Sequence, residues 1–270
     1  MRLVLDGRSP IATFAVVALL ATASTRADTF KANGGDIEVT PIIHASVQIE
    51  YAGKVIQVDP WSQGDYSRAK PADLILVTDD NSHHLDVAQI QKLRRPGGVV
   101  VSPAIGKPKL PDATIMAIGE SATVAGIPVE AIAMYDIKPG EPWHPKGRGN
   151  GYVVTLGGKR LYFAGVTECV PEMQALKNVD IAFMPMNLPL QRMLPAALAD
   201  CVKTFKPNVV YPYHYDQDWV SRVTSGRGVQ PPASAAATAA SLQAFMDALT
   251  GGAIEMRGAN WYPADRQTGR

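Results

Sequence analysis

The residues that could do chemistry gather in one short segment, VTDDNSHH, at positions 77–84. It holds oxygen and imidazole donors at five positions, namely Asp79, Asp80, Asn81, His83 and His84. Imidazole and carboxylate are common ligands of zinc, and a carboxylate beside a bound ion can also act as a general base. Because so polar a group does not fit an apolar core, we interpret it as half of a metal site.

Two further candidates lie much later in the chain. Asp136, in AMYDI, and His214, in YPYHY, each lie at the end of a run with the pattern of a strand. Strand ends bring loops together, and ligands usually bind there. Three histidines with one open coordination position form a known catalytic zinc arrangement, so His83, His84 and His214 predict a zinc site.

Strands and helices must position these residues. The chain contains two rounds of short β-branched runs with helical stretches between them, and Pro and Gly mark the turns. We expect strands at 37–43, 46–51, 54–60, 72–78, 97–103, 113–118, 122–126, 127–135, 151–165 (a hairpin), 180–186, 209–215 and 253–258, and helices at 85–95, 171–177, 195–207 and 233–250. Two sheets packed face to face with helices outside would accommodate this order in a single domain over 28–270.

The composition limits the classes of partner. The chain has 270 residues and a formal net charge of +1, which fits one ordinary globular domain. It has no basic cluster of the kind that binds nucleic acid, and no run beyond its amino terminus is long and apolar enough to span a bilayer. We therefore expect a small-molecule partner and neither nucleic acid nor membrane. The sequence does not indicate an oligomeric state.

The first 27 residues have the pattern of a secretory signal peptide. Arg2 and Arg8 flank a short positively charged region, which is followed by the apolar stretch IATFAVVALLATA. Small residues occupy the positions that a signal peptidase reads before residue 28. The stretch is short for a transmembrane helix, so we prefer a cleaved signal to a membrane anchor or an ordinary apolar helix. This interpretation predicts a periplasmic or secreted protein.

Cys169 and Cys201 are the two cysteines of the chain. They neither form a disulfide framework nor have the spacing of a metal site. In an oxidising compartment they could pair, but buried free cysteine is also common, so both alternatives stay open. We interpret both as structural, since one of them falls on the apolar stripe of an expected helix, formed by Ala197, Leu198, Cys201, Val202 and Phe205.

Several motifs together resemble a known family. They are HASVQI, VIQVDPW, LVTDDNSHHLD, HPKGRGNGYVV, RLYFAGVTECVPEMQALKNVDIAFMPMN, VVYPYHY and the late WYP. These motifs are similar to those of a bacterial branch of the metallo-β-lactamase fold hydrolases, which is related to lactonase-like and general metal-dependent members. The resemblance implies an α/β fold, a four-layer αββα sandwich, and a metal motif of the form H-x-H-x-D-H after a strand.

The metal motif departs from the family pattern. By the resemblance, Asp79 stands at the first ligand position, Asn81 replaces the second histidine, and His83 replaces the aspartate. His84 keeps the last histidine of the motif, and Asp136 falls near another ligand position of the first metal. The motif has therefore changed its donor set rather than lost its donors.

Two unequal metal positions follow from the departures. Val166, in AGVTE, replaces the aspartate that bridges two metals in the family, and His214 keeps the final ligand. Because an aliphatic side chain cannot coordinate, we expect no tight dinuclear centre. The first position is left with oxygens of Asp79, Asn81 and Asp136, which suit Mg, Ca or Mn better than zinc. The second keeps three imidazoles and predicts one zinc ion, with manganese or no metal as alternatives.

These residues predict a hydrolase with a reduced, mononuclear site. One zinc ion would lower the pKa of a bound water to about 7 and polarise a carbonyl or phosphoryl oxygen. Asp79 or Asp80 would orient or deprotonate that water. The expected substrate is a small ester, lactone, amide or phosphoester, and the positive site favours an anionic one. The competing interpretation is an inactive protein of the same fold that binds a ligand or partner, because fold alone does not establish activity.

Three other candidates have more ordinary explanations. His44, in IIHASV, either approaches the site or is a hydrogen-bonded histidine beside the core, and we prefer the second interpretation. His144 lies in a loop with Lys146 and Arg148, which either meets an anionic substrate or is simply solvated. Glu168 could serve as a replacement metal ligand, but a carboxylate just before an expected helix is commonly explained by capping.

Overall fold

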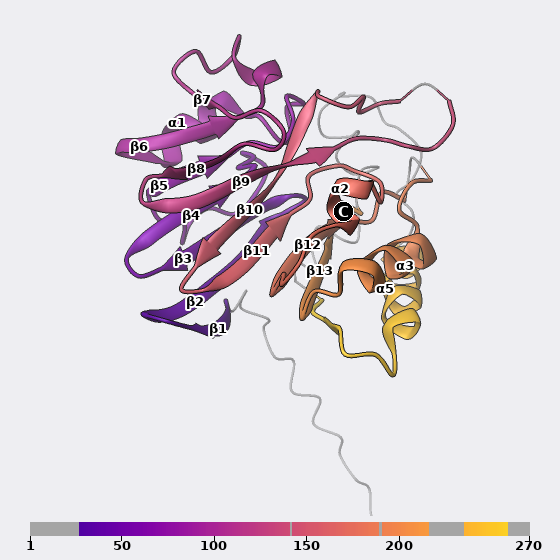
Figure 1. Ribbon diagram of the computed structural model, residues 1–270. Coiled ribbons are helices and arrows are strands. Elements are labelled where there is room, and N and C mark those ends of the chain that lie inside the picture. Colours follow the sequence, from indigo (N-terminus) through magenta and orange to yellow (C-terminus); the bar gives the residue numbers. More distant parts are fainter. Residues whose placement is uncertain (1–26, 141, 189–190, 216–234, 259–270) are drawn as a thin grey trace, which may run out of the picture.

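The fold is a sandwich of two seven-stranded sheets (Figure 1). The computed structural model describes residues 27–140, 142–188, 191–215 and 235–258. The first sheet has the order β1 (Asp28–Ala32), β2 (Gly35–Ile43), β3 (Ser46–Tyr51), β4 (Lys54–Val58), β5 (Ala72–Leu76), β6 (Arg94–Ser102) and β7 (Thr114–Ile115). The second has the order β14 (Glu255–Met256), β13 (Val209–Tyr213), β12 (Ile181–Pro185), β11 (Lys159–Phe163), β10 (Gly149–Leu156), β9 (Ile127–Met134) and β8 (Ser121–Val124).

Both sheets are mixed in the same way. Strands β1 to β4 pair antiparallel and β4 to β7 pair parallel, while β8 to β11 pair antiparallel and β11 to β14 pair parallel. Parallel neighbours end at the same edge of a sheet. The loops after β4, β5 and β13 therefore begin at the carboxyl edges of their sheets, and each of these loops carries residues of the candidate site.

Helices cover the outer faces of the sandwich (Figure 1). They are α1 (Val87–Leu93), the short 3-10 turn η1 (Ala104–Gly106), α2 (Pro171–Gln174), α3 (Pro195–Phe205) and α5 (Ala235–Leu249). All five residues of β5 are buried, and they alternate between two cores: Leu74 and Leu76 face the second sheet, whereas Ile75 packs with Ile90 and Leu93 of α1. This double burial explains why ADLIL is apolar everywhere except at Asp73.

A row of stacked aromatic rings crosses three neighbouring strands of the second sheet. Phe163, Phe183 and Tyr211 lie in register on three parallel strands, and their rings stack with centroids 4.7 and 5.0 Å apart. On the opposite face of β11, Tyr162 meets Phe205 of α3 edge to face at 6.1 Å. Because successive side chains of a strand point to opposite faces, β11 joins the inner core to the helical layer. The four-layer αββα sandwich expected from the sequence is confirmed.

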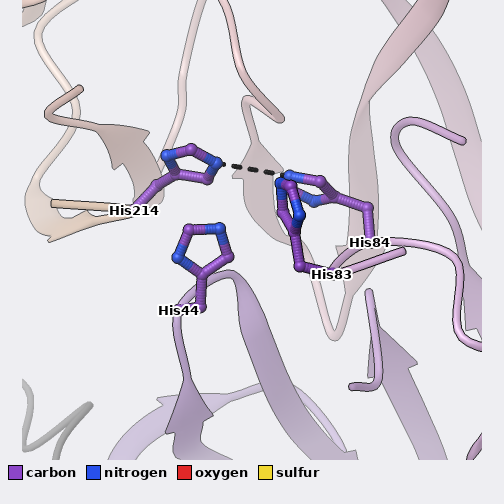
Figure 2. Close-up of side chains that lie close together, drawn as sticks. All are labelled: His44, His83, His84 and His214. Carbon is purple, nitrogen blue, oxygen red and sulfur yellow. Dashed lines mark hydrogen bonds between the residues drawn. The ribbon is translucent and has the colours of Figure 1, made fainter. Parts of the chain in front are cut away.

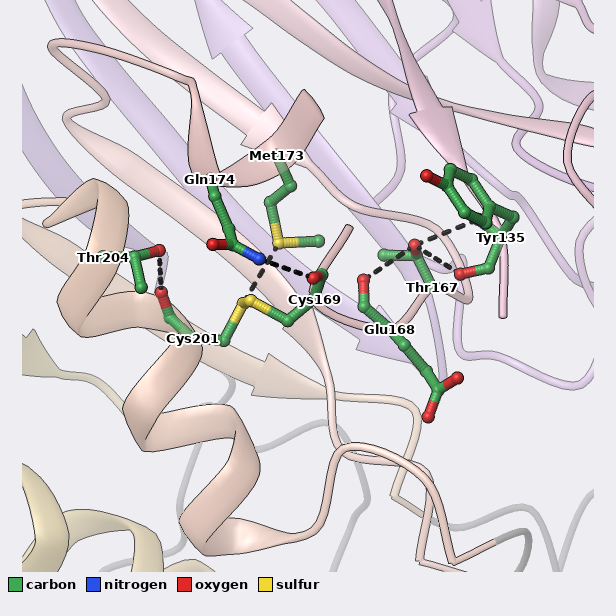
Figure 3. Close-up of a disulfide and its surroundings, with 8 residues drawn as sticks. All are labelled: Tyr135, Thr167, Glu168, Cys169, Met173, Gln174, Cys201 and Thr204. Carbon is green, nitrogen blue, oxygen red and sulfur yellow. Dashed lines mark hydrogen bonds between the residues drawn. A yellow bond between two sulfur atoms is a disulfide. The ribbon is translucent and has the colours of Figure 1, made fainter. Parts of the chain in front are cut away.

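A disulfide ties the second sheet to its helical layer (Figure 3). Cys169, in the segment between β11 and α2, pairs with Cys201 of α3, and their Cα atoms are 5.7 Å apart. That separation lies within the range that a disulfide spans without backbone movement. Met173 packs on the bridge, with its Sδ atom 3.4 Å from Cys201 Sγ. The question that the sequence left open is therefore answered by pairing.

Local differences from the expected elements have simple causes. Strand β1 was not expected, because its alternation is short; it pairs along its whole length with β2. Helix α1 begins later than residue 85, since the Asp86 side chain caps it by accepting from the backbone N–H of Gln89. On α3 the stripe is buried at Leu198 and beyond, but Ala197 is exposed. The expected signal segment and the WYP motif lie outside the described residues, and among the described helices none is long and apolar enough to cross a membrane.

Candidate metal centre

The segment after β5 is a series of tight turns that presents two histidines. Its first turn closes when Asp79 Oδ1 accepts a hydrogen bond from Asn81 N at 3.0 Å. The Asn81 carbonyl then accepts from the backbone N–H groups of His84 and Leu85, at 2.9 and 2.8 Å. These bonds fix the backbone ahead of α1, so the half-buried His83 and the fully buried His84 are held by the fold.

Four histidines form one cluster between the two sheets (Figure 2). His83 and His84 come from the loop after β5, His214 directly follows β13, and His44 lies between β2 and β3. Each offers one ring nitrogen, and these four atoms all lie within 4.8 Å of one another. His84 Nε2 and His214 Nε2 lie 3.3 Å apart, within hydrogen-bond distance of each other (Figure 2). The structure thus brings the three histidines expected from the sequence together and adds a fourth.

His44 reaches the cluster because it lies on a tight turn. Strands β2 and β3 pair up to Ile43 and Ser46, so only His44 and Ala45 connect them. The φ angle of His44 is 55°, in the left-handed region that histidine adopts more readily than most side chains do. Its carbonyl accepts a hydrogen bond from His214 N at 3.2 Å. The interpretation of His44 as a histidine merely beside the core was incomplete, because periodicity showed the strands and not this turn.

A buried carboxylate orients His84. Asp59 Oδ2 lies 2.7 Å from His84 Nδ1, and neither side chain is exposed. The same carboxylate accepts hydrogen bonds from Thr78 N at 2.8 Å and Thr78 Oγ1 at 2.6 Å. With the carboxylate as acceptor, Nδ1 of His84 must carry the proton, which leaves the Nε2 lone pair directed at the cluster. Metal-bound histidines are held by carboxylates in this way.

Two rings of the cluster have the protonation state that metal binding requires. Burial lowers the pKa of His83 and of His214 well below the ordinary histidine range, and the neighbouring imidazoles lower both further. Both rings are therefore neutral at physiological pH, and neutral imidazole is the form that coordinates. A tetrahedral zinc ion with Zn–N bonds of about 2.0–2.1 Å places its ligand atoms about 3.3 Å apart. The separation of 3.3 Å between the Nε2 atoms of His84 and His214 fits such an ion.

The oxygen ligands expected from the sequence make other contacts. Asp79 is fully buried, and Arg148 Nε donates to its Oδ2 at 3.0 Å. Arg148 also donates to Asp80 Oδ1 at 2.5 Å, and Lys109 Nζ lies 3.6 Å from the other Asp80 oxygen. Asn81 enters the site through its backbone. Asp79 and Asp80 are not members of the group whose ligand atoms cluster, because a guanidinium pairs with both.

The surroundings of Asp79 hold its carboxyl group in the charged form. Burial by itself would raise the pKa of its carboxyl group, but the His84 ring, the Arg148 guanidinium and the Asn81 N–H together hold that pKa below its ordinary value. Asp79 is therefore an ion whose charge Arg148 neutralises. Sequence reasoning left Arg148 in a loop that either meets an anionic substrate or is solvated. Its place just before β10, whose Asn150 N donates to the carbonyl of Thr78 after β5, was the information that the sequence did not supply.

Asp136 belongs to a second polar network. Its Oδ2 accepts from His144 N at 2.9 Å, and Arg192 NH1 lies 3.6 Å from its Oδ1. Glu168 accepts from Arg192 at 3.1 Å and from the backbone N–H groups of residues 137 and 138 at 2.6 and 2.5 Å. Asp136 and Glu168 are likewise outside the histidine group. These contacts account for both carboxylates without a metal, and they hold the loop that follows β9.

The bridging position of the family is apolar. Val166 is buried, with 3% of its surface exposed, and its backbone N–H points to the Met134 sulfur at 3.1 Å. An aliphatic side chain supplies no ligand atom, so this strand end offers nothing to hold two ions together. Within the described residues the clustered ligand atoms are all imidazole nitrogens, and imidazole nitrogen suits Zn, Cu, Fe or Ni rather than Mg or Ca.

Comparison with known proteins finds similar metal-dependent hydrolases. Residues 38–214 match a family model described as a beta-lactamase superfamily domain. A UPF0173 metal-dependent hydrolase of Thermococcus onnurineus is 30% identical over 196 residues, covering 67% of this chain and 85% of that protein. A similar protein of Ligilactobacillus salivarius is 27% identical over 194 residues, covering 64% and 82%. A solved structure from Parabacteroides distasonis, provisionally assigned as a metal-dependent hydrolase, is 32% identical with a TM-score of 0.74, covering 87% of this chain and 99% of that one.

Proposed function

The chain belongs to the beta-lactamase superfamily, and from this premise we propose that it is an exported hydrolase that uses a single metal ion. In this proposal His83, His84 and His214 hold the ion. The observation that carries it is the buried imidazole cluster, in which the Nε2 atoms of His84 and His214 lie 3.3 Å apart. When bound, the ion would lower the pKa of a water and polarise the bond to be cleaved.

The proposal of a single ion rests on the contacts of the carboxylates at the first metal position. The carboxylate of Asp79 is neutralised by Arg148, and that of Asp136 lies beside Arg192. A second cation close to these two arginines would be repelled by them. Val166 adds no bridging oxygen, so the remaining donors favour one ion in the nitrogen cluster.

The residues of this chain have distinct roles in the proposal. Asp59 holds the His84 ring in the tautomer that can coordinate, and the backbone turns of 79–84 fix the approach of His83. A general base at neutral pH needs a proton affinity that is raised, not lowered. Since its pKa is held down, Asp79 suits the role of anchoring Arg148 better than the role of base that its position in the sequence suggests.

The charge of the site favours an anionic substrate. All the proposed ligands are neutral imidazoles, so the ion would keep its full positive charge, unlike an ion that is bound by carboxylates. We therefore propose a small ester, lactone, amide or phosphoester that carries a negative group. Zinc is the metal that this donor set favours among those abundant in cells. The buried Cys169–Cys201 disulfide supports export, because disulfides persist in oxidising compartments.

Metal content tests the proposal directly. We expect about one zinc per chain in protein purified without chelator or affinity nickel, and loss of that zinc in His84→Ala and in His214→Ala. Asn81→Ala is the matched control, since it alters the same motif but removes no imidazole; it should keep its zinc. Full zinc in both histidine variants would refute the proposed ligand set.

Hydrolysis separates this proposal from its alternative. The pairing of Arg148 with Asp79 also suits a protein that binds metal but has no hydrolytic activity, because the guanidinium occupies the place of a cation at the first metal position. A screen of esters, lactones, amides and phosphoesters with the zinc-loaded protein decides between them. Turnover that disappears in His84→Ala supports the hydrolase. Zinc binding without turnover on any of these classes supports a binding role.

A further inference from the structure

His44 has no part in the three-histidine ligand set, yet it lies inside the same cluster (Figure 2). We propose that His44 is a fourth protein ligand of the ion. This proposal rests on the proposed function, in that it concerns the same metal. It changes the chemistry of the site, because four imidazoles fill a tetrahedral shell, so the water of the proposed hydrolase would need a fifth coordination position.

The distances between rings carry the first part of the argument. The ring centroid of His44 lies 3.9 Å from that of His214, 5.0 Å from that of His83 and 5.6 Å from that of His84. Four imidazoles around one zinc ion have centroids about 5 Å apart, since each ring extends beyond a bond of about 2 Å. The three separations lie on either side of that value. His44 thus lies near enough to the other three rings for small side-chain adjustments to make it a co-ligand.

The backbone holds His44 in this place. The residue occupies a connection of two residues, its φ angle is 55°, and its carbonyl accepts from His214 N at 3.2 Å. His214 itself has a φ angle of 57°. Side chains other than glycine are uncommon in this region, and such conformations persist where the surrounding structure over-determines them, often at ligand sites. The two left-handed residues are joined by one hydrogen bond, so the turn and the end of β13 present their imidazoles together.

Burial and surroundings fit a ligand better than a surface histidine. His44 is fully buried, and the ring of Trp61 lies 6.0 Å from its ring and 6.2 Å from that of His83. An apolar wall of this kind excludes water from the imidazoles and strengthens the binding of a cation by neutral donors. The four histidines come from three separate loops, and together they enclose the position from both sheets.

Substitutions at a left-handed position must respect its backbone. His44→Asn and His44→Gly remove the imidazole, and both residues tolerate a positive φ angle, so the turn can keep its shape. The matched control is His144→Gln, which removes a histidine with only 5% exposed surface that lies outside the cluster. Circular dichroism confirms the fold of each variant before metal is added.

The measurements are zinc affinity, by competition with a chelator, and the visible spectrum of the cobalt(II)-loaded protein. Cobalt bands depend on the number and kind of ligands, so the spectrum reports the coordination itself. We expect both His44 variants to bind zinc about tenfold or more weakly and to show altered cobalt bands, with His144→Gln unchanged in both. Wild-type affinity together with a wild-type spectrum in His44→Asn and His44→Gly would overturn the proposal.

The outcomes also separate this proposal from the one on which it rests. If zinc binding survives in the His44 variants but disappears in His84→Ala, the three-histidine site is supported and only the role of His44 as a ligand is rejected. An absence of zinc and cobalt binding in wild-type protein would overturn both proposals. Zinc binding that weakens in the His44 variants without any hydrolytic activity would support the fourth ligand and reject the hydrolase.

Discussion

Replacement of Asp59 by asparagine would reverse the tautomer of His84. The Asp59 carboxylate now accepts from Thr78 N, Thr78 Oγ1 and His84 Nδ1. In Asp59→Asn the amide oxygen can still accept from Thr78 N, but the amide NH₂ then faces His84 and must donate to Nδ1. The proton of His84 would move to Nε2, where it occupies the lone pair that is needed for coordination. Asparagine tolerates the φ angle of 41° at this position, so the loop keeps its shape.

The size of the effect follows from the contact that changes. The Asp59–His84 contact is 2.7 Å long between two side chains with no exposed surface. A hydrogen bond to a charged group contributes about 1.5–3 kcal/mol. If this free energy stabilises the coordinating tautomer, its loss weakens metal affinity by about 10- to 100-fold. Substitutions of carboxylates that support metal-binding histidines have effects of that size.

Zinc competition with a chelator at fixed pH measures this loss. Asp73→Asn is the matched control, since it neutralises another buried aspartate of the same sheet, one that accepts from Val55 N at 2.9 Å and Arg95 at 2.9 Å, away from the histidines. We expect Asp59→Asn to bind zinc about 10- to 100-fold more weakly and Asp73→Asn to bind as the wild type does. Unchanged affinity in Asp59→Asn would refute the view that this carboxylate sets the tautomer.

Two further predictions concern the charges and the covalent link around the site. Arg148→Gln removes the guanidinium that helps to hold the pKa of Asp79 low. The ionised Asp79 stabilises the folded state at pH values above its unfolded pKa of about 3.9, and this stabilisation is lost as pH falls through its lower pKa in the folded state. The variant should therefore unfold in acid at a higher pH than the wild type, and an identical acid transition by circular dichroism would contradict this. Replacing Cys169 and Cys201 together by alanine opens a loop of sequence separation 32, which should lower the free energy of unfolding by about 3–4 kcal/mol in urea titrations. Wild-type protein treated with dithiothreitol should approach the variant, and a loss below about 1 kcal/mol would show that the link constrains the unfolded chain little.

The sequence predicted the fold well because the fold depends on periodicity. Strand β12 is a continuous apolar run and β5 is apolar except at Asp73, and such runs are typical of parallel strands buried on both faces. The motifs after β5 and β13 placed His83, His84 and His214 at strand ends, and the structure brings them together. In each case the signal lies in a few adjacent residues.

The rest of the site depends on contacts between distant residues, which periodicity does not report. His44 enters through the handedness of a two-residue turn, and Arg148 reaches Asp79 across 69 positions of sequence. Asp59 has the same character, since its partner His84 is 25 positions away. From the sequence alone, Asp59 lies at the end of an expected strand, and Arg148 lies in a loop that either meets an anionic substrate or is solvated. Only the parallel pairing of β4 with β5, and the approach of β10, give them their roles.

The contacts of Asp79 connect the altered motif with the number of metals. A buried carboxylate that lost its metal would be an unpaired charge, and removing one partner of such a pair costs several kcal/mol. In this chain Arg148 supplies the missing cation, and its contacts at 3.0 Å to Asp79 and 2.5 Å to Asp80 satisfy both carboxylates. The guanidinium cannot lose its proton at any physiological pH, so this compensation is permanent. In the proposed function this pairing closes the first position by charge, and we expect a cation to bind in the histidine cluster instead.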